Sequence, residues 1–376
     1  MPGFVAPGFE PVADAFEKNF RERGEVGAAF AAQQDRKVVV DLGGGIADVA
    51  SGRPWQENTI EIVFSATKAF VAICILLLLD RELIALTDPV RKHWPEFGKP
   101  EIRILDLVTH RARLPGIETP VAMDDVTDDR RMAVLLAAQQ PSRDPRAAFC
   151  YHALTYGWLC GELVRRVDGR SIGRFFAEEI ATPLDLELWI GLPAEEAHRV
   201  ATLVLSPEWG QSEHLSGDTY TRDPLMRIAW GNPETFSATL FPWNRPAFHR
   251  AEIPGVNGIG TARSIAKLYA CLADGGSPLM SGATLQAGRQ VLAEGFDELN
   301  NEERRFGVGF ALQTETMALG PPADAFGHSG AGGSMHGAWP SQRVGFSYAM
   351  NLMRDGVRPD PRSKALLDAL YRSVSR

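Results

Sequence analysis

The stretch Ser65-Ala66-Thr67-Lys68 combines residue types and a spacing that could support nucleophilic chemistry. A serine hydroxyl attacks a carbonyl poorly at neutral pH unless a neighbouring base takes its proton. On a helix, a lysine three residues after a serine lies one turn along, on the same face. A helix start also offers free backbone N–H groups that can polarise a substrate carbonyl. The motif therefore predicts an acyl-transfer active site.

The sequence around this motif favours a rigid setting. A strand-like run, Ile60 to Phe64, leads into it, and an almost wholly apolar helical run, Ala69 to Leu79, follows. Such a helix is buried on nearly all sides, so packing would fix the backbone of Ser65. Burial of Lys68 would favour its neutral, basic form. The alternative is that Ser65 is a helix N-cap and that the lysine is incidental.

Two other serine motifs in the chain are interpreted as structural. Ser264 and Lys267 form a second S-x-x-K, but they fall in an amphipathic surface helix for which Thr261 is the expected N-cap. The segment Gly169–Gly173 matches G-x-S-x-G, which in α/β-hydrolases follows a buried strand. Here it follows a charged helix end, so Ser171 is expected to cap the next helix.

A tyrosine could complete the site. Tyr151 is expected in a loop just before a helix that spans Trp158 to Val167. A phenol has a pKa of about 10, and a neighbouring ammonium such as that of Lys68 would lower this pKa and allow the phenol to act as a base. The alternative is that Tyr151 and Tyr156 are both half-buried packing residues, which is the commoner role of tyrosine.

A glycine-rich segment late in the chain, Gly327–Ser334, is the second candidate part. A strand there becomes almost free of side chains, so that a ligand backbone could approach closely. Its exposed N–H groups could supply a second oxyanion donor. The alternative is a glycine-rich hairpin turn.

Composition restricts the classes of protein that fit. With 376 residues, 45% hydrophobic and 23% charged, we expect a globular protein of two closely packed domains. A formal net charge of −8 without a basic run argues against a nucleic-acid partner. We expect no secretory signal, no membrane span and a cytoplasmic location. Four cysteines without C-x-x-C spacing fit a reducing compartment, and eight scattered histidines form no metal-binding motif. We expect neither a metal nor a cofactor.

The order of the expected elements indicates the fold class. Strands at both ends of the chain, with helices between them, predict an α/β (α+β) domain built from residues 1–66 and 255–376. Residues 67–254 form an inserted, mainly helical domain, in which a Pro-, Trp- and Gly-rich stretch from about residue 193 forms irregular, pocket-forming loops. The expected strands are Ala28–Ala32, Lys37–Leu42, Ile60–Phe64, Gly307–Thr314, Ala325–Ser329, His336–Pro340 and Val344–Leu352, and the expected terminal and late helices are Phe9–Gly24, Thr261–Asp274 and Ser363–Val374.

The order Ser-x-x-Lys, tyrosine, then a late His-Ser-Gly strand resembles the serine β-lactamase and penicillin-binding-protein superfamily. Within it, the chain is most similar to class C β-lactamases and the β-lactamase-like family VIII esterases. The resemblance covers nearly the whole chain. It also includes Asp41–Asp48, Asp88–Val90, Trp94–Phe97, Leu107–His110, Leu114–Gly116, Gly157–Arg166 and Asn257–Arg263. It implies a β-lactamase-like antiparallel sheet flanked by helices, with the inserted helical domain.

The resemblance also implies roles for individual residues. Ser65 would be the acylated nucleophile, Lys68 its proton partner, and Tyr151 the general base that deprotonates Ser65 and later activates water. The oxyanion hole would consist of the backbone N–H groups of Ser65 and Ala331. The substrate would lie against the strand end His328-Ser329-Gly330 and against Ala153.

Two departures from the superfamily pattern affect the expected substrate. Penicillin-recognising members carry an asparagine two places after the tyrosine, where this chain has Ala153, and Lys-Thr-Gly where it has His328-Ser329-Gly330. Losing the amide-binding group and the fixed cation weakens recognition of β-lactams but need not impair attack on an ester. We therefore expect hydrolysis of a small-molecule carboxylic ester. The alternatives are β-lactam or amide hydrolysis (as in D-amino-acid peptidases), acyl transfer, and a non-catalytic acyl-binding protein. The sequence leaves the oligomeric state open, a homo-oligomer included.

Overall fold

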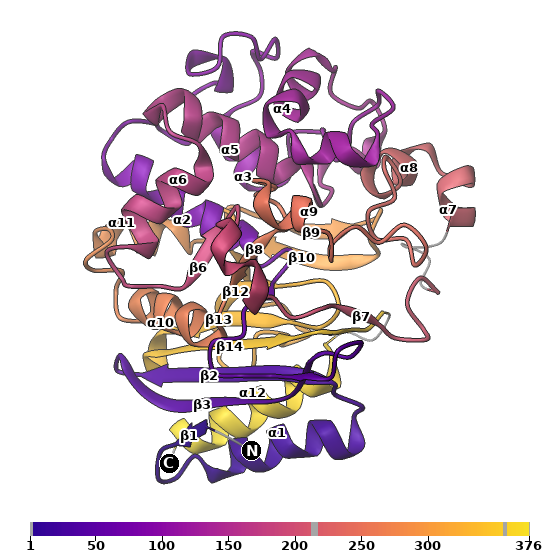
Figure 1. Cartoon of the computed structure of the whole chain (residues 1–376). Coiled ribbons are helices and arrows are strands. Elements are labelled where there is room, and N and C mark those ends of the chain that lie inside the picture. Colours follow the sequence, from indigo (N-terminus) through magenta and orange to yellow (C-terminus); the bar gives the residue numbers. More distant parts are fainter. Residues whose placement is uncertain (1–2, 212–216, 356–358, 376) are drawn as a thin grey trace.

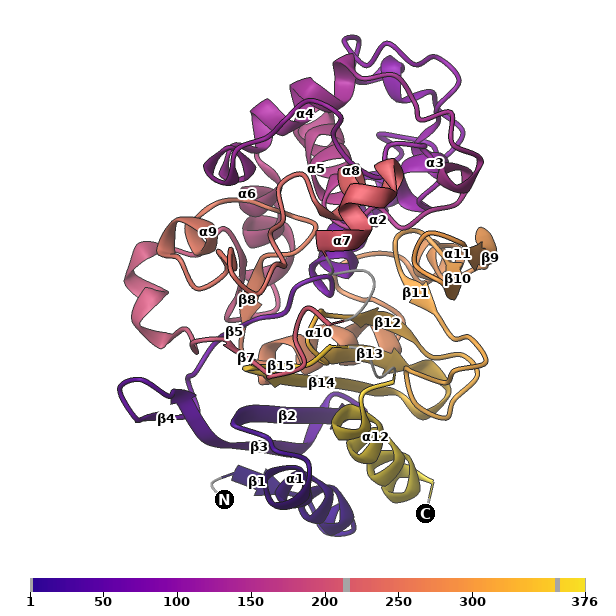
Figure 2. The same cartoon turned by 90° about the vertical axis from the view of Figure 1, so that its right-hand side faces the viewer.

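The central feature of the fold is a long antiparallel sheet. The computed structural model describes residues 3–211, 217–355 and 359–375. The strands of the protein, of which β5 to β8 and β15 lie outside the long sheet, are β1 (Gly3–Val5), β2 (Gly27–Gln34), β3 (Lys37–Asp48), β4 (Arg53–Pro54), β5 (Glu61–Ile62), β6 (Leu188–Ile190), β7 (Val204–Leu205), β8 (Gly258–Gly260), β9 (Ala293–Asp297), β10 (Glu302–Phe306), β11 (Ala311–Leu312), β12 (Phe326–Ser329), β13 (Met335–Trp339), β14 (Val344–Met350) and β15 (Leu352–Met353). The sheet runs β1-β3-β2-β14-β13-β12-β11-β10-β9 (Figure 1), with β4 beside β3 (Figure 2). All its pairings are antiparallel, as expected.

Helices cover the sheet and form a separate group beyond it. They are α1 (Glu10–Glu22), α2 (Thr67–Asp80), α3 (Ile104–Val108), α4 (Asp129–Ala138), α5 (Thr155–Asp168), α6 (Ile172–Phe176), α7 (Gly217–Arg222), α8 (Pro224–Trp230), α9 (Pro246–Arg250), α10 (Ala262–Ala273), α11 (Gly282–Gly288) and α12 (Pro361–Val374). In both views α3, α4 and α5 lie at one end of the molecule, and both chain termini lie at the other, beside α1 and α12 (Figures 1 and 2). The predicted helical segment 67–254 contains α2 to α9, and the division of the chain into two domains at its ends stays a prediction.

Small residues let helix α10 approach the sheet closely. A Cβ atom on Gly345 would come within 2.5 Å of the carbonyl oxygen of Ala266 on α10. Ala31 and Ala349 belong to the same buried cluster as Ala266. Because successive side chains of a strand point to opposite faces, the alternate residues of β2 and β14 face away from α10. There Trp339 packs against Phe346 and against Tyr371 of α12, so the sheet is covered on both faces.

Helix α2 is buried along its length, as its apolar sequence predicts. Every residue from Thr67 to Leu78 is buried, and the helix contacts α5, α6, α11 and strand β12. Its environment therefore fixes both its position and its rotation about its axis. Within the described ranges, no helix combines the length and the apolar character needed to cross a bilayer.

One part of the sheet differs from the sequence-based expectation. The expected strand Gly307–Thr314 is reduced to the two residues of β11, and the sheet continues instead into a hairpin of β9 and β10. Strand β10 reads Glu-Glu-Arg-Arg-Phe, with only its last residue fully buried. Its charged side chains conceal the hydrophobic alternation by which a strand is recognised. The missed hairpin matters because β10 carries Arg304.

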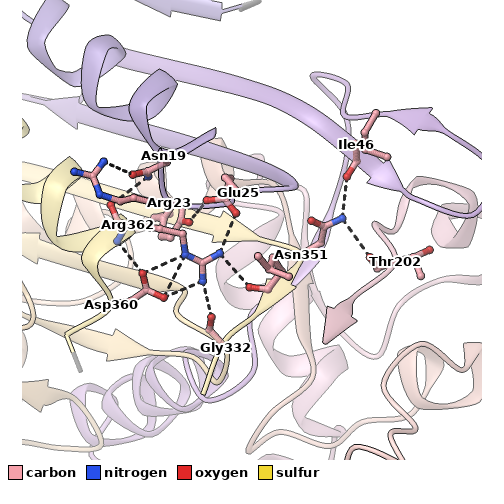
Figure 3. A network of polar contacts seen from close by, with 11 residues as sticks. Asn19, Arg23, Glu25, Ile46, Thr202, Gly332, Asn351, Asp360 and Arg362 are labelled. Atoms are coloured by element: carbon pink, nitrogen blue, oxygen red, sulfur yellow. Dashed lines mark hydrogen bonds and ion pairs between the residues drawn. The ribbon is translucent and has the colours of Figure 1, made fainter. Parts of the chain in front are cut away.

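A buried ion network connects the C-terminal helix to the sheet and to the glycine-rich segment. Arg362, near the start of α12, is wholly buried, and its guanidinium pairs with Glu25 at 3.0 Å and with Asp360 at 2.8 Å (Figure 3). Its Nη2 also donates to the carbonyl oxygen of Gly332 at 2.9 Å. Asp360 in turn lies close to Gly333, where an added Cβ would come within 2.3 Å of Oδ2. The network thus holds the loop that follows Gly330.

We expect Arg362→Met to lower the free energy of unfolding by about 3–5 kcal/mol, because it leaves two buried carboxylates without their cation. The matched control is Lys364→Met, two residues along the same helix. Lys364 pairs with Asp368 on the surface and is 56% exposed, so its loss should cost less than about 1 kcal/mol. Urea unfolding of both variants measures the difference, and equal losses would contradict a special role for the buried network.

Candidate active site

Ser65 occupies a turn that delivers the chain into helix α2, which begins at Thr67. The residue before it, Phe64, has a φ of +46°, a left-handed conformation that a bulky side chain adopts only under strong constraint. The constraint is aromatic packing, because the Phe64 ring lies 5.7 Å from that of Phe236 and 5.6 Å from that of Trp243. Packing against aromatic rings from a distant part of the chain therefore fixes this turn and, with it, the position of Ser65.

Lys68 contacts Ser65 and is held by two carbonyl groups. Its Nζ lies 3.3 Å from Ser65 Oγ, 2.7 Å from the carbonyl oxygen of Ala153 and 2.8 Å from that of Gly255. The side chain is fully buried, and burial lowers its pKa well below the usual 10.5, with a further decrease from the charge of Arg304. The amine therefore has the environment of a base that faces the hydroxyl.

Tyr151 lies in the loop before helix α5, as predicted, although α5 begins at Thr155 and not at Trp158. Its ring centroid is 4.7 Å from Lys68 Nζ, so the amine contacts both the hydroxyl of Ser65 and this ring. Tyr151 is 4% exposed. The three residues selected from the sequence are thus brought together by two helix starts.

The glycine-rich segment reaches the same place. A Cβ atom on Gly330 would come within 2.3 Å of the carbonyl oxygen of Val63, two residues before Ser65. Only a residue without a side chain allows this approach. Gly330 N donates to the carbonyl oxygen of Ser334 at 2.9 Å, and Ala331 follows in the turn, half-buried. The use of the N–H groups of Ser65 and Ala331 as oxyanion donors stays a prediction.

His328 and Ser329 differ in their environments. His328 is buried, and burial, followed by the charge of Lys68, lowers its pKa to about 3, so the imidazole is neutral at physiological pH. Ser329 is exposed. Both residues line a cavity of about 70 Å³ together with Arg304. A larger cavity of about 250 Å³ lies between β3 and the start of α10, and none of the predicted site residues lines it.

Three residues of this region were not predicted from the sequence. His110 packs its ring against those of Tyr151 and Tyr156, at 4.8 and 5.1 Å. Arg304 lies over the Tyr151 ring, with Cζ 4.3 Å from the ring centroid. Asp297 accepts a hydrogen bond from the backbone N–H of Tyr151 at 2.9 Å. His110 falls in the Leu-Val-Thr-His segment of the family resemblance, but Arg304 and Asp297 belong to no motif.

The two alternative serines have structural partners. Thr261 caps α10 by accepting from the N–H of Ser264, whose Oγ accepts from the N–H of Glu187 at 2.9 Å. Ser171 caps α6 and donates to Glu252 at 2.7 Å. The predicted N-caps, Thr261 for α10 and Ser171 for α6, are confirmed, whereas Ser264 lies buried and not on the surface. Among the described residues, no three His, Cys, Asp or Glu side chains gather in a way that could hold a metal ion.

Comparison with known proteins agrees with this arrangement. The sequence is 33% identical over 368 residues to the Esterase/beta-lactamase LipL of Mycobacterium tuberculosis (strain ATCC 25618 / H37Rv), which covers 93% of this chain and 82% of LipL. A family VIII carboxylesterase crystal structure superposes with a TM-score of 0.89 at 36% identity, covering 99% of each chain. A penicillin-binding protein homologue from Caulobacter crescentus has a TM-score of 0.88 at 36% identity, covering 98% of this chain and 99% of the other.

The expected β-lactamase-like fold is therefore confirmed along with the expected resemblance. The family described as Beta-lactamase matches residues 13–371, which is nearly the entire sequence. The chain belongs to the beta-lactamase family.

Proposed function

We propose that this protein is a serine hydrolase of the carboxylesterase type that cleaves small carboxylic esters through an acyl-Ser65 intermediate. The observation that carries the proposal is the position of the Lys68 amine, buried and 3.3 Å from Ser65 Oγ. The names of LipL and of the family VIII carboxylesterase support the ester as substrate class.

The hydrogen bonds of Lys68 support its role as the first proton acceptor. A neutral amine has two N–H bonds and one lone pair, and carbonyl oxygens only accept. If the carbonyls of Ala153 and Gly255 take the two N–H bonds, the lone pair is directed to the hydroxyl of Ser65. Tyr151 contacts the same amine, so the protons of this pair are coupled and need not belong to one residue alone.

The reaction then proceeds in two halves. Ser65 Oγ attacks the ester carbonyl carbon while its proton passes to the Lys68–Tyr151 pair, and the carbonyl oxygen becomes an oxyanion that the N–H groups of Ser65 and Ala331 stabilise. The bond to the alkoxy group breaks, and the alcohol leaves with that proton. In the second half Tyr151 takes a proton from water, the hydroxide attacks the acyl carbon, and the acid is released as Ser65 regains a proton.

The site favours an uncharged ester over a β-lactam or amide. The imidazole of His328 is neutral and offers no fixed cation to a substrate carboxylate. Ala153 offers only a methyl group, and its carbonyl oxygen is engaged by Lys68. An ester also has a better leaving group than an amide and needs less stabilisation.

We place the enzyme in the cytoplasm because all four cysteines are buried free thiols.

Ser65→Ala should abolish hydrolysis of a short-chain aryl ester, and it should also abolish the initial burst of one alcohol per site that an acyl-enzyme produces. A fluorophosphonate probe should label the unaltered enzyme at Ser65, as located by peptide mass spectrometry. Ser264→Ala, in the second S-x-x-K, is the matched control and should keep both turnover and labelling.

Full ester turnover by Ser65→Ala would refute the proposal. A chromogenic cephalosporin hydrolysed faster than short esters would replace it with β-lactam hydrolysis at the same serine. A protein that neither turns over esters nor reacts with the probe would instead be a non-catalytic acyl-binding protein.

Gly330→Ala should lower kcat by about 10²- to 10³-fold, the usual cost of losing one oxyanion donor. The reason is that the new methyl group would meet the carbonyl oxygen of Val63 and so displace the turn that carries Ala331. Gly98→Ala is the control, because no atom lies within 4 Å of its added methyl group. Steady-state kinetics and the thermal midpoint of both variants test this, and an unchanged kcat for Gly330→Ala would contradict it.

A further inference from the structure

Strand β10 brings a permanent cation to the tyrosine of the candidate site. Arg304 Cζ lies 4.3 Å from the centroid of the Tyr151 ring, closer than Lys68 Nζ at 4.7 Å. We propose that Arg304 is a positioning residue that holds the Tyr151 phenol in place and favours its ionised, proton-accepting form. This inference rests on the proposed ester hydrolysis.

The positioning part of the proposal follows from one shared carboxylate. Asp297 Oδ2 accepts from the backbone N–H of Tyr151 at 2.9 Å and from Arg304 Nε at 3.1 Å. Asp297 is fully buried, and Asn300 donates two further hydrogen bonds to it, at 3.2 and 2.8 Å. A single buried group therefore fixes the tyrosine loop and the arginine relative to each other. The hairpin of β9 and β10 supplies both Asp297 and Arg304.

The electrostatic part follows from the charges that surround the ring. Two histidines, His328 and His110, face the ring. Burial lowers the pKa of His328 to about 3. Burial, and after it the charge of His152, lowers the pKa of His110 well below 6.5. Both imidazoles are therefore uncharged near neutral pH. Burial likewise favours the neutral form of Lys68.

Arg304 behaves differently from these groups. Burial opposes its charge, but Glu302 and Asp297, followed by Tyr151, raise the pKa of the guanidinium above its usual range, so it keeps its proton. Of the described groups that face the ring, Arg304 is thus the one whose positive charge persists at every relevant pH. Glu302, 2.8 Å from Arg304 Nη2, and Asp297, 3.1 Å from Nε, carry opposite charges, so the effect on Tyr151 depends on the guanidinium lying directly over the ring.

The charge of Arg304 should affect the protonation of both Tyr151 and Lys68. A positive charge within about 4–6 Å favours an ionised acid over its neutral form by about 1–3 pK units. Over an aromatic ring, the attraction is also stronger when the ring carries the electron density of a phenolate. The same charge lowers the pKa of Lys68. At a given pH, Arg304 therefore leaves more of both Tyr151 and Lys68 able to accept a proton.

The test is the pH profile of kcat for Arg304→Gln. Removing the charge should move the midpoint of the rising limb to higher pH by about one unit, so that raising the pH restores much of the lost rate. Arg304→Lys should keep the midpoint near that of the unaltered enzyme. A uniform loss of kcat with an unmoved midpoint would show a structural role only and overturn the proposal.

Glu302→Gln is the matched control from the same strand. It removes a negative charge beside Arg304, so the midpoint should move to lower pH, and an unmoved midpoint would count against the electrostatic part of the proposal. A shift to higher pH, as for Arg304→Gln, would mean that any disturbance of the hairpin changes the profile, which would also refute the proposal. This variant keeps the test decisive if Arg304→Gln does not fold.

A measurement without turnover separates this inference from the proposed function. The ultraviolet absorbance of tyrosinate is titrated in the unaltered enzyme and in Tyr151→Phe, and the difference reports ionisation of Tyr151 alone. That ionisation should occur at higher pH in Arg304→Gln than in the unaltered enzyme. Identical titrations would defeat the inference even if Ser65 is labelled, whereas failure of Ser65 to react with the fluorophosphonate would defeat the proposed function and leave the titration interpretable.

Discussion

The structure depends on keeping an amine buried at the start of an apolar helix. Taking Lys68 out of water is costly, and the cost is offset only if hydrogen-bond partners are in place. The partners are the carbonyl groups of Ala153 and Gly255, which come from distant parts of the chain. A Cβ atom on Gly157 would lie 2.0 Å from the N atom of Gly255, so these two segments also pack backbone against backbone. The position of one nitrogen thus requires α2, α5 and the segment before β8 to meet.

Local sequence patterns were sufficient for the parts of the fold that are locally determined. The apolar run of α2, the strands β2, β13 and β14, and the Thr261 cap of α10 were predicted because propensity, turn residues and capping act over a few residues. The approach of Tyr151 to Lys68 and of Gly330 to Val63 is of another kind. No local pattern specifies it, and its prediction came from the order of motifs in the family.

Other features could not be predicted because tertiary contacts decide them. Four of the five residues of β10 are charged, and the placement of Arg304 among them depends on partners such as Asp297, seven positions away and on another strand. The positive φ of Phe64 is supported by rings from the stretch expected to form irregular loops. Trp243, with no exposed surface, and Phe236, at 4%, belong to these loops. In this structure their rings pack against Phe64, the residue before Ser65, and the formation of a pocket by these loops stays a prediction.

The electrostatics of the site depend on two neutral histidines, His110 and His328, and on Arg304, which is permanently charged. Because His328 is uncharged, the strand beside Ser65 presents no cation to a substrate, whereas Arg304 directs its charge at the ring of Tyr151. A cation on the strand beside Ser65 would act on binding, since it would attract a substrate carboxylate before and after the reaction alike. A cation beside the Tyr151 ring would act on the proposed proton acceptor and hence on the chemical step, whatever the substrate's charge. An uncharged ester needs only the second effect, and the position of Arg304 over the Tyr151 ring is the one that would supply it.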